Sequence, residues 1–256
     1  MRVSGILDRM SQREPYGDNL RRNAIFLLSP ANASGIRGKR LLGADGNSLL
    51  AERLRGPGAP VGEVYQFISS LYFRGKLAYA RQFTSPPPGA AGVHIITGAG
   101  LMLPETPVTL AELQRISATA IDADNSVYRL SLDRDLLLLR QLVGCETDVI
   151  LLGSIATRKY LTPLLAVFGE RLLFPKDFIS RGDMSRGSLL LRCCSTMCAL
   201  EYLPAAGLAF TSKKSRASSG PPLSRPPLIR ISKFCSIRRL RCRQAEISKR
   251  WSRLAG

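Results

Sequence analysis

Residues 181–187, with the sequence RGDMSRG, hold two arginines, one carboxylate and two glycines. Guanidinium groups donate paired hydrogen bonds to oxyanions, so Arg181 and Arg186 are candidates for binding a phosphate or a polar ring. Asp183 is the candidate catalytic residue, as an orienting group or a base for water. The alternative is structural, because Asp183 also stands where a helix cap would stand. Use of the RGD triplet as an integrin ligand requires an extracellular loop, and the start of the chain does not resemble a signal peptide.

Short loops of small and polar residues follow three further apolar runs of the chain. In an open parallel sheet, ligands bind outside the carboxyl ends of the strands, so these loops should converge with the RGDMSRG segment. Their glycines would let backbone amides hold an anion, whereas the alternative for the Gly-Ser pair is a tight turn and helix cap. The candidate ligand-binding residues in these loops are Ser29, Asn32, Thr97, Gly98, Gly153, Ser154 and Lys159.

Several common enzyme classes are not indicated by the motifs of this chain. The stretch TGAGL is too short for a dinucleotide fingerprint, and no GxxxxGK[ST] motif of a P-loop occurs. His94 is the only histidine and lies in an apolar run, so we interpret it as a core residue. No GxSxG elbow accompanies it, which argues against a Ser-His-Asp triad. We expect no cofactor and no metal.

The elements that position these loops alternate between apolar strands and amphipathic helices. Solid apolar runs, rather than alternating ones, are typical of parallel strands that are covered on both faces. We therefore predict an α/β fold, a three-layer domain with a mostly parallel sheet and helices on both faces. The expected parallel strands are 23–28, 93–97, 148–152 and 171–174. The expected helices are 46–55, 61–83 with a break near Gly75, one capped by Thr109 and Glu112, 131–143, 155–169, and one from the RGDMSRG segment to about residue 200.

The net charge of +18 is concentrated at the C-terminal end of the chain. Residues 201–256 hold 13 Lys and Arg against 2 Asp and Glu, and they are rich in Ser and Pro. We predict a loosely ordered N-terminus at 1–20, an α/β domain at 21–205 and a disordered basic tail at 206–256. Such a tail can remain solvated, condense on nucleic acid or be an accidental extension of the reading frame.

The apolar runs and the cysteines indicate the cellular compartment of the protein. No run approaches the roughly 20 apolar residues of a membrane helix, so we expect no membrane span and a cytoplasmic protein. The six cysteines lack the spacing of a zinc site and are interpreted as free thiols in a reducing compartment.

The stretch LYFRGKLAYAR, residues 71–81, places Arg74 and Arg81 on one helical face with aromatic residues interleaved. Such a face can contact nucleic acid. The alternative is a helix that packs through its aromatic side chains and leaves its arginines in solvent.

Three stretches, LLSPAN, LYFRGKLAYAR and VHIITGAGLMLPETPV, together resemble a group of uncharacterised bacterial proteins. These are distantly similar to the YaaA peroxide-stress proteins and to uracil-DNA-glycosylase-like domains of base-modification systems. The resemblance covers residues 23–115 and implies a three-layer α/β domain with a link to nucleic acids or their bases. The chain departs from the pattern at Thr97-Gly98-Ala99, where Ser-Ala-Lys is typical, so a lysine role at that position is lost.

We therefore expect a nucleic-acid-linked protein that binds or processes a nucleobase, nucleoside or nucleotide at the carboxyl edge of its sheet. The expected partners are nucleic acid or a nucleotide-like small molecule. The alternative is a non-enzymatic interaction or scaffold module, because no complete catalytic set is recognised.

Overall fold

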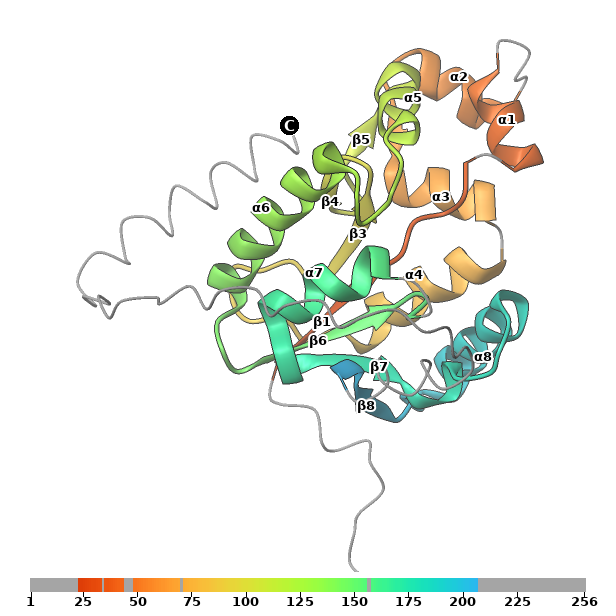
Figure 1. Cartoon of the computed structure of the whole chain (residues 1–256). Coiled ribbons are helices and arrows are strands. Elements are labelled where there is room, and N and C mark those ends of the chain that lie inside the picture. Colours follow the sequence, from red (N-terminus) through yellow and green to blue (C-terminus); the bar gives the residue numbers. More distant parts are fainter. Residues whose placement is uncertain (1–22, 34, 44–47, 70, 156–157, 207–256) are drawn as a thin grey trace, which may run out of the picture.

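The computed structural model describes residues 23–206, except residues 34, 44–47, 70 and 156–157 (Figure 1). Within this part the main sheet has six strands in the order β4-β3-β1-β6-β7-β8. The inner four strands are parallel to one another. The edge strands β4 and β8 run antiparallel to β3 and β7. The strands are β1 (Asn23–Leu28), β3 (Val93–Thr97), β4 (Gly100–Met102), β6 (Thr147–Leu152), β7 (Leu172–Pro175) and β8 (Tyr202–Pro204).

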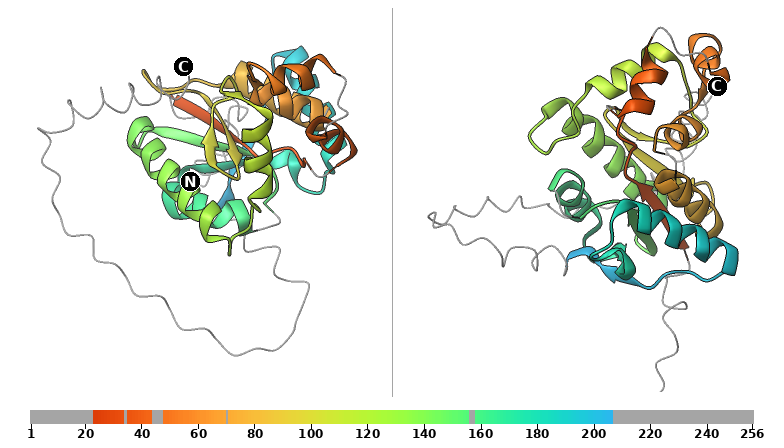
Figure 2. Two further views of the ribbon diagram at one scale, coloured as in Figure 1. Left: turned by 90° about the horizontal axis from the view of Figure 1, so that it is seen from above. Right: turned by 90° about the vertical axis from the view of Figure 1, so that its right-hand side faces the viewer.

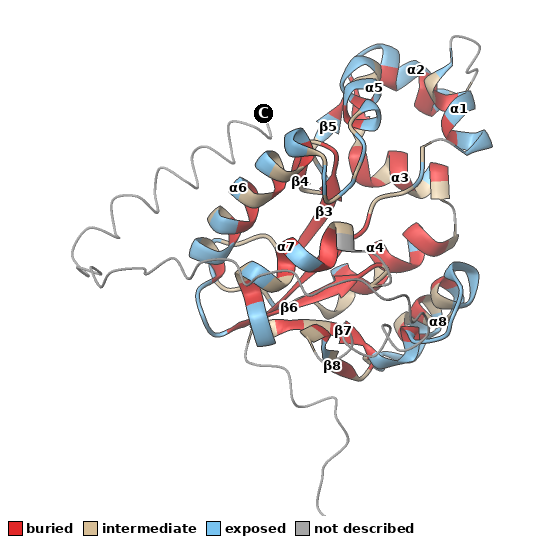
Figure 3. Cartoon of the chain, in the orientation of Figure 1, coloured by how far each residue is buried: buried red, intermediate tan, exposed pale blue. Residues whose placement is uncertain are grey.

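The apolar runs form the buried centre of this sheet. All of β3 and β6 is buried, as is β1 from its second residue onward (Figure 3). Strand β1 is in register with β6 over its whole length, from Asn23 opposite Thr147 to Leu28 opposite Leu152. The prediction that the four apolar strands lie parallel in one sheet is confirmed. Their carboxyl ends therefore share one edge.

Helices cover both faces of the sheet, as predicted (Figures 1 and 2). On one face, α4 contacts β1 and β3, and α8 packs against α4. On the other face, α6 and α7 pack together. Helices α1, α2 and α5 contact one another beyond the carboxyl ends of β1 and β3 (Figure 1). The helices are α1 (Ile36–Leu42), α2 (Leu49–Arg55), α3 (Val61–Ser69), α4 (Leu71–Phe83), α5 (Leu110–Ala118), α6 (Ser126–Val143), α7 (Arg158–Phe168) and α8 (Asp183–Thr196). Short elements are the antiparallel pair β2 (Ala59–Pro60) and β5 (Pro107–Val108) and the 3-10 turns Gly169–Arg171 and Lys176–Phe178.

Some helix boundaries differ from those expected. In place of the single long helix predicted over 61–83, α3 ends at Ser69 and α4 begins at Leu71, and Gly75, near which a break was expected, lies inside α4. Helix α6 begins at Ser126, because the Asn125 side chain caps it by accepting from two backbone amides, so the predicted start at Ser131 is wrong. The capping box of Thr109 and Glu112 is present as predicted.

The chain termini lie outside the described residues. The predicted N-terminal segment and nearly all of the predicted basic tail fall there, with Cys235 and Cys242. Within the described residues, none of the helices combines the length and apolar character needed to cross a bilayer. The cysteines of this part, Cys145, Cys193, Cys194 and Cys198, are free thiols.

Candidate ligand-binding site

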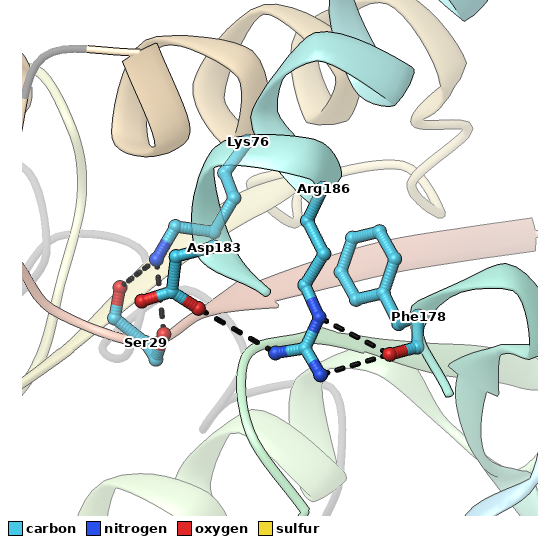
Figure 4. A network of polar contacts seen from close by, with 5 residues as sticks. All are labelled: Ser29, Lys76, Phe178, Asp183 and Arg186. Atoms are coloured by element: carbon cyan, nitrogen blue, oxygen red, sulfur yellow. Dashed lines mark hydrogen bonds and ion pairs between the residues drawn. The ribbon is translucent and has the colours of Figure 1, made fainter. Parts of the chain in front are cut away.

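A buried lysine lies at the carboxyl end of β1, where the sheet topology places a ligand (Figure 4). Lys76, from α4, is only 1% exposed. Its Nζ donates to the backbone oxygen of Ser29 at 2.5 Å and to the Ser29 hydroxyl at 2.9 Å. Burial lowers the pKa of Lys76 to about 7, Asp183 partly offsets this, and Arg186 lowers the pKa further. The amine therefore exists in both protonation states near neutral pH.

Helix α4 buries this amine because Lys76 lies on the apolar face of the helix. Tyr72 precedes it by four residues and Phe73 by three, which places all three side chains on one side of the helix. The ammonium nitrogen lies 4.6 Å from the centre of the Tyr72 ring and 4.9 Å from that of Phe73. Sequence reasoning missed this residue, and a lysine at this spacing from two aromatic residues was the signal that could have found it.

A close helix crossing brings the RGDMSRG segment to Lys76. A Cβ atom on Gly75 of α4 would lie 2.8 Å from the Gly187 oxygen, and one on Gly187 of α8 would lie 2.9 Å from the Tyr72 Cα. Only glycine permits this separation of the two backbones. The second glycine of the segment therefore serves contact between helices, and not the approach of a backbone to a ligand.

The arginines of the segment diverge. Arg186 packs over the Phe178 ring and donates to the Phe178 oxygen at 2.8 and 3.2 Å, while its third nitrogen faces Asp183 at 3.6 Å (Figure 4). Arg181 is exposed and donates to Ser185 at 3.3 Å. Of the two arginines, Arg186 is therefore the one near enough to Lys76 to affect its pKa.

Asp183 is the first residue of α8, and Gly182 is the cap residue. No side-chain hydrogen bond caps this helix, so the alternative that Asp183 is the cap is wrong. The Asp183 side chain is 70% exposed and raises the pKa of Lys76. The Asp183 carboxylate lies beside the buried Lys76 amine (Figure 4).

Four tyrosines from four helices lie near one another, and one of them, Tyr72, contacts the Lys76 amine. Tyr160 of α7 lies close enough to Tyr65, Tyr72 and Tyr128 for charges on these phenols to repel one another. Burial raises the pKa of Tyr72 and of Tyr160 to about 12, so both remain protonated at neutral pH. The Tyr128 hydroxyl donates to the Lys159 oxygen, whereas the buried Tyr72 hydroxyl has the Arg186 guanidinium near its oxygen and no acceptor for its proton among the described residues.

The predicted site residues divide into those that meet at Lys76 and those that do not. A Cβ atom on Gly153 would lie 2.9 Å from the Ser29 Cβ, so these two residues adjoin. Thr97 instead closes the β3–β4 hairpin, accepting from the Ala99 amide and donating to the Gly100 oxygen. The residues brought together directly or through Lys76 are Ser29, Gly153, Asp183 and Arg186.

The remaining predicted residues lie around this cluster or apart from it. Gly98 packs against α5, where an added Cβ would lie 2.4 Å from the Ile116 oxygen. Asn32 is exposed, and Ser154 is partly buried in the loop after β6. The Lys159 amine lies 5.1 Å from the centre of the Tyr160 ring. None of these four has a described contact with Lys76.

The aromatic residues of α4 face the core, and its arginines face solvent. Tyr72, Phe73 and Tyr79 are buried, whereas Arg74 and Arg81 are exposed. Arg81 pairs with Glu105 at 2.8 Å. The packing interpretation of this helix is the one that the structure bears out.

His94 is a core residue, as its apolar surroundings in the sequence indicated. It is 2% exposed, and its Nε2 lies 3.0 Å from the Ala91 oxygen. Burial lowers its pKa from 6.5 to about 4. The unfolded chain therefore binds more protons between these values, and stability falls as the pH decreases through them.

The expected loss of unfolding free energy from His94 is about 3 kcal/mol between pH 6.5 and pH 4. Urea unfolding at several pH values measures it. The control is His94→Leu, in which this part of the pH dependence should disappear while the contribution of the carboxylates stays. An identical pH profile in the variant would contradict the prediction.

No protein-family model, curated protein or solved structure matches this chain. Among the residues that the structure describes, no cluster of His, Cys, Asp and Glu is arranged to hold a metal ion. The interpretation of the site therefore starts from Lys76 and its neighbours.

Proposed function

We propose that this protein binds a nucleobase, nucleoside or nucleotide at the carboxyl edge of its sheet, with Lys76 as the acid–base group of a reaction on that ligand. The observation that supports it best is the buried Lys76 amine beside Ser29, at the place where open α/β sheets bind ligands. An amine whose pKa lies near 7 can both accept and donate a proton at physiological pH.

The neighbours of Lys76 suit a ligand of this class. Aromatic rings flank the amine, Arg186 supplies a guanidinium, and the Tyr72 hydroxyl has an unused hydrogen-bonding capacity. Planar heterocycles stack on such rings, and their carbonyl and phosphate oxygens accept from such donors. Asp183, more exposed than the rest, is placed to orient a ligand or water that approaches from solvent.

The second candidate is a non-enzymatic interaction module. It is favoured by the structural roles of Thr97, Gly98 and Gly187, and by the two hydrogen bonds that Lys76 already makes within the protein. In that case Lys76 holds the end of β1 against α4 and no small molecule binds beside it.

Thermal unfolding with a panel of nucleobases, nucleosides and nucleotides separates these candidates. A ligand that binds only the folded state raises the melting temperature, and about 100-fold excess over Kd adds about 2.7 kcal/mol. We expect a rise for the natural chain, a lost response in Lys76→Met and an unchanged response in Arg81→Gln, which alters only an exposed ion pair. No response to any of the panel would contradict the proposal and favour the interaction module.

Asp183→Asn tests the role of the exposed carboxylate. Because Asp183 does not cap α8 through its side chain, stability should change by less than about 1 kcal/mol. Removal of its charge should lower the pKa of Lys76, and loss of the orienting carboxylate should weaken binding of a neutral nucleobase or nucleoside, which the same thermal assay measures. Full binding by this variant would limit Asp183 to its place in the first turn of the helix.

A further inference from the structure

We propose that the group bound beside Lys76 is a phosphate-type oxyanion, held by the Lys76 ammonium, the Tyr72 hydroxyl and Arg186, and that its binding takes up one proton at Lys76. This inference rests on the proposed function and specifies which part of the ligand the site recognises. Free phosphate and the phosphate of a nucleotide share this chemistry.

The first support is a buried hydroxyl group whose proton has no acceptor. Tyr72 is 7% exposed, and the Arg186 guanidinium lies close enough to donate toward its oxygen, but none of the described residues accepts the hydroxyl proton. Buried hydroxyls in proteins are nearly always hydrogen-bonded, because an unsatisfied one costs about 1–3 kcal/mol. The phenol remains protonated at neutral pH, so it can donate to an acceptor on a ligand.

The second support is the balance of charge. The acceptors of Lys76 are neutral oxygens of Ser29. The Arg186 side chain, 14% exposed, faces the site's one described carboxylate at 3.6 Å, and that carboxylate, on Asp183, is 70% exposed. Two mostly buried cations thus face one largely solvated anion when Lys76 is protonated. An oxyanion would supply the missing negative charge.

The third support is the geometry that joins these donors. Lys76 lies one helical turn after Tyr72 on α4, and its amine nitrogen lies 4.6 Å from the centre of the Tyr72 ring. The Gly75–Gly187 crossing sets α8, and with it Arg186, against this turn. Arg186 is near enough to Tyr72 to lower the pKa of that phenol against the larger effect of burial. The donors therefore come from α4 and α8, two helices in close backbone contact.

Proton uptake follows from the state of the amine. The groups that face Lys76 are Asp183 and Arg186 of α8, Tyr72 of its own helix, and Ser29 after β1. Burial raises the pKa of Tyr72 to about 12, so this phenol keeps its proton near neutral pH, and Ser29 does not titrate. An oxyanion stabilises the charged amine and so raises the pKa of Lys76 above about 7. Affinity should therefore increase as the pH falls through that value.

The test uses sulfate, whose charge is constant between about pH 6 and about pH 9, with binding measured by calorimetry. We expect the natural chain to bind sulfate at least about tenfold more tightly at the lower pH, with about one proton taken up in the intermediate range. Lys76→Met should lose both the affinity and its pH dependence. Tyr72→Phe should bind several-fold more weakly and keep the pH dependence, and Arg81→Gln should match the natural chain.

Sulfate binding that is absent, or equally strong at both pH values, would overturn the inference. So would unchanged affinity in Tyr72→Phe, a variant that decides the matter even where Lys76→Met does not fold. A nucleoside compared with its 5′-monophosphate separates this inference from the proposed function. If the nucleoside and its monophosphate bind equally and sulfate does not bind, the oxyanion is rejected and the proposed function stands. If sulfate binds and no nucleoside or nucleotide does, the oxyanion stands and the proposed function is rejected.

Discussion

Replacing Lys76 by Met should change the free energy of unfolding differently at pH 6 and at pH 9. The change should be more favourable at pH 6, by about 3 kcal/mol. The pKa of this amine is about 7 in the folded protein against 10.5 ordinarily. Between these values the unfolded chain binds more protons, so the natural chain gains stability as the pH rises. The full cost of the buried charge is present below the folded pKa and diminishes above it. Methionine has no such charge, and this component of the pH dependence disappears.

Urea unfolding of both proteins at both pH values measures this double difference, in which groups common to the two proteins cancel. The matched control is Lys39→Met on α1, which removes an exposed amine instead of a buried one. Loss of the hydrogen bonds to Ser29 lowers the stability of the variant at both pH values and does not enter the double difference. A pH-independent effect of Lys76→Met would mean that the amine does not titrate near neutrality.

Gly187→Ser should destabilise the protein by about 2–4 kcal/mol, as overpacking at a rigid contact does. The added Cβ would lie 2.9 Å from the Tyr72 Cα and 3.0 Å from the Leu71 oxygen, and both are backbone atoms that cannot rotate away. The α4–α8 contact must then widen, which moves Arg186 away from Tyr72 and Lys76. We therefore expect ligand binding to weaken as well as stability, measured by urea unfolding and calorimetry.

Gly182→Ser is the control for this prediction. The same substitution is made five residues earlier in the same segment, where an added Cβ meets nothing within 4 Å. Gly182 occupies the cap position of α8, where serine is a better residue than glycine, so stability should stay the same or rise by a few tenths of a kcal/mol. Equal effects of the two substitutions would show that the helix crossing tolerates a side chain.

The parallel sheet was predictable from the sequence because its cause is local. Runs such as 23–28 and 148–152 contain almost no polar positions, and such runs are stable only where helices cover both faces. The Thr109 and Glu112 capping box is likewise a matter of residues three apart. The two short antiparallel strands, β4 and β8, were not predicted, because three residues carry too little periodicity to identify a strand.

The candidate site was predicted only in part. The rule that loops after parallel strands converge led to Ser29, Gly153 and the RGDMSRG segment, and the structure places these around one point. The same rule also led to Thr97, whose hydroxyl makes its hydrogen bonds within the β3–β4 turn, accepting from the Ala99 amide and donating to the Gly100 oxygen.

The sequence by itself determined the four parallel strands, the layers and the shared carboxyl edge, since these follow from which residues avoid water. Only the tertiary structure showed that Lys76 is buried, that Arg186 rather than Arg181 faces Asp183, and that Asp183 does not cap its helix. The physical reason is distance along the chain. The contacts of Lys76 with Ser29 and of Gly75 with Gly187 join segments that only the packing of α4 and α8 brings together. The pKa of an amine depends on that packing, because it is set by the water and charge that other segments remove or supply.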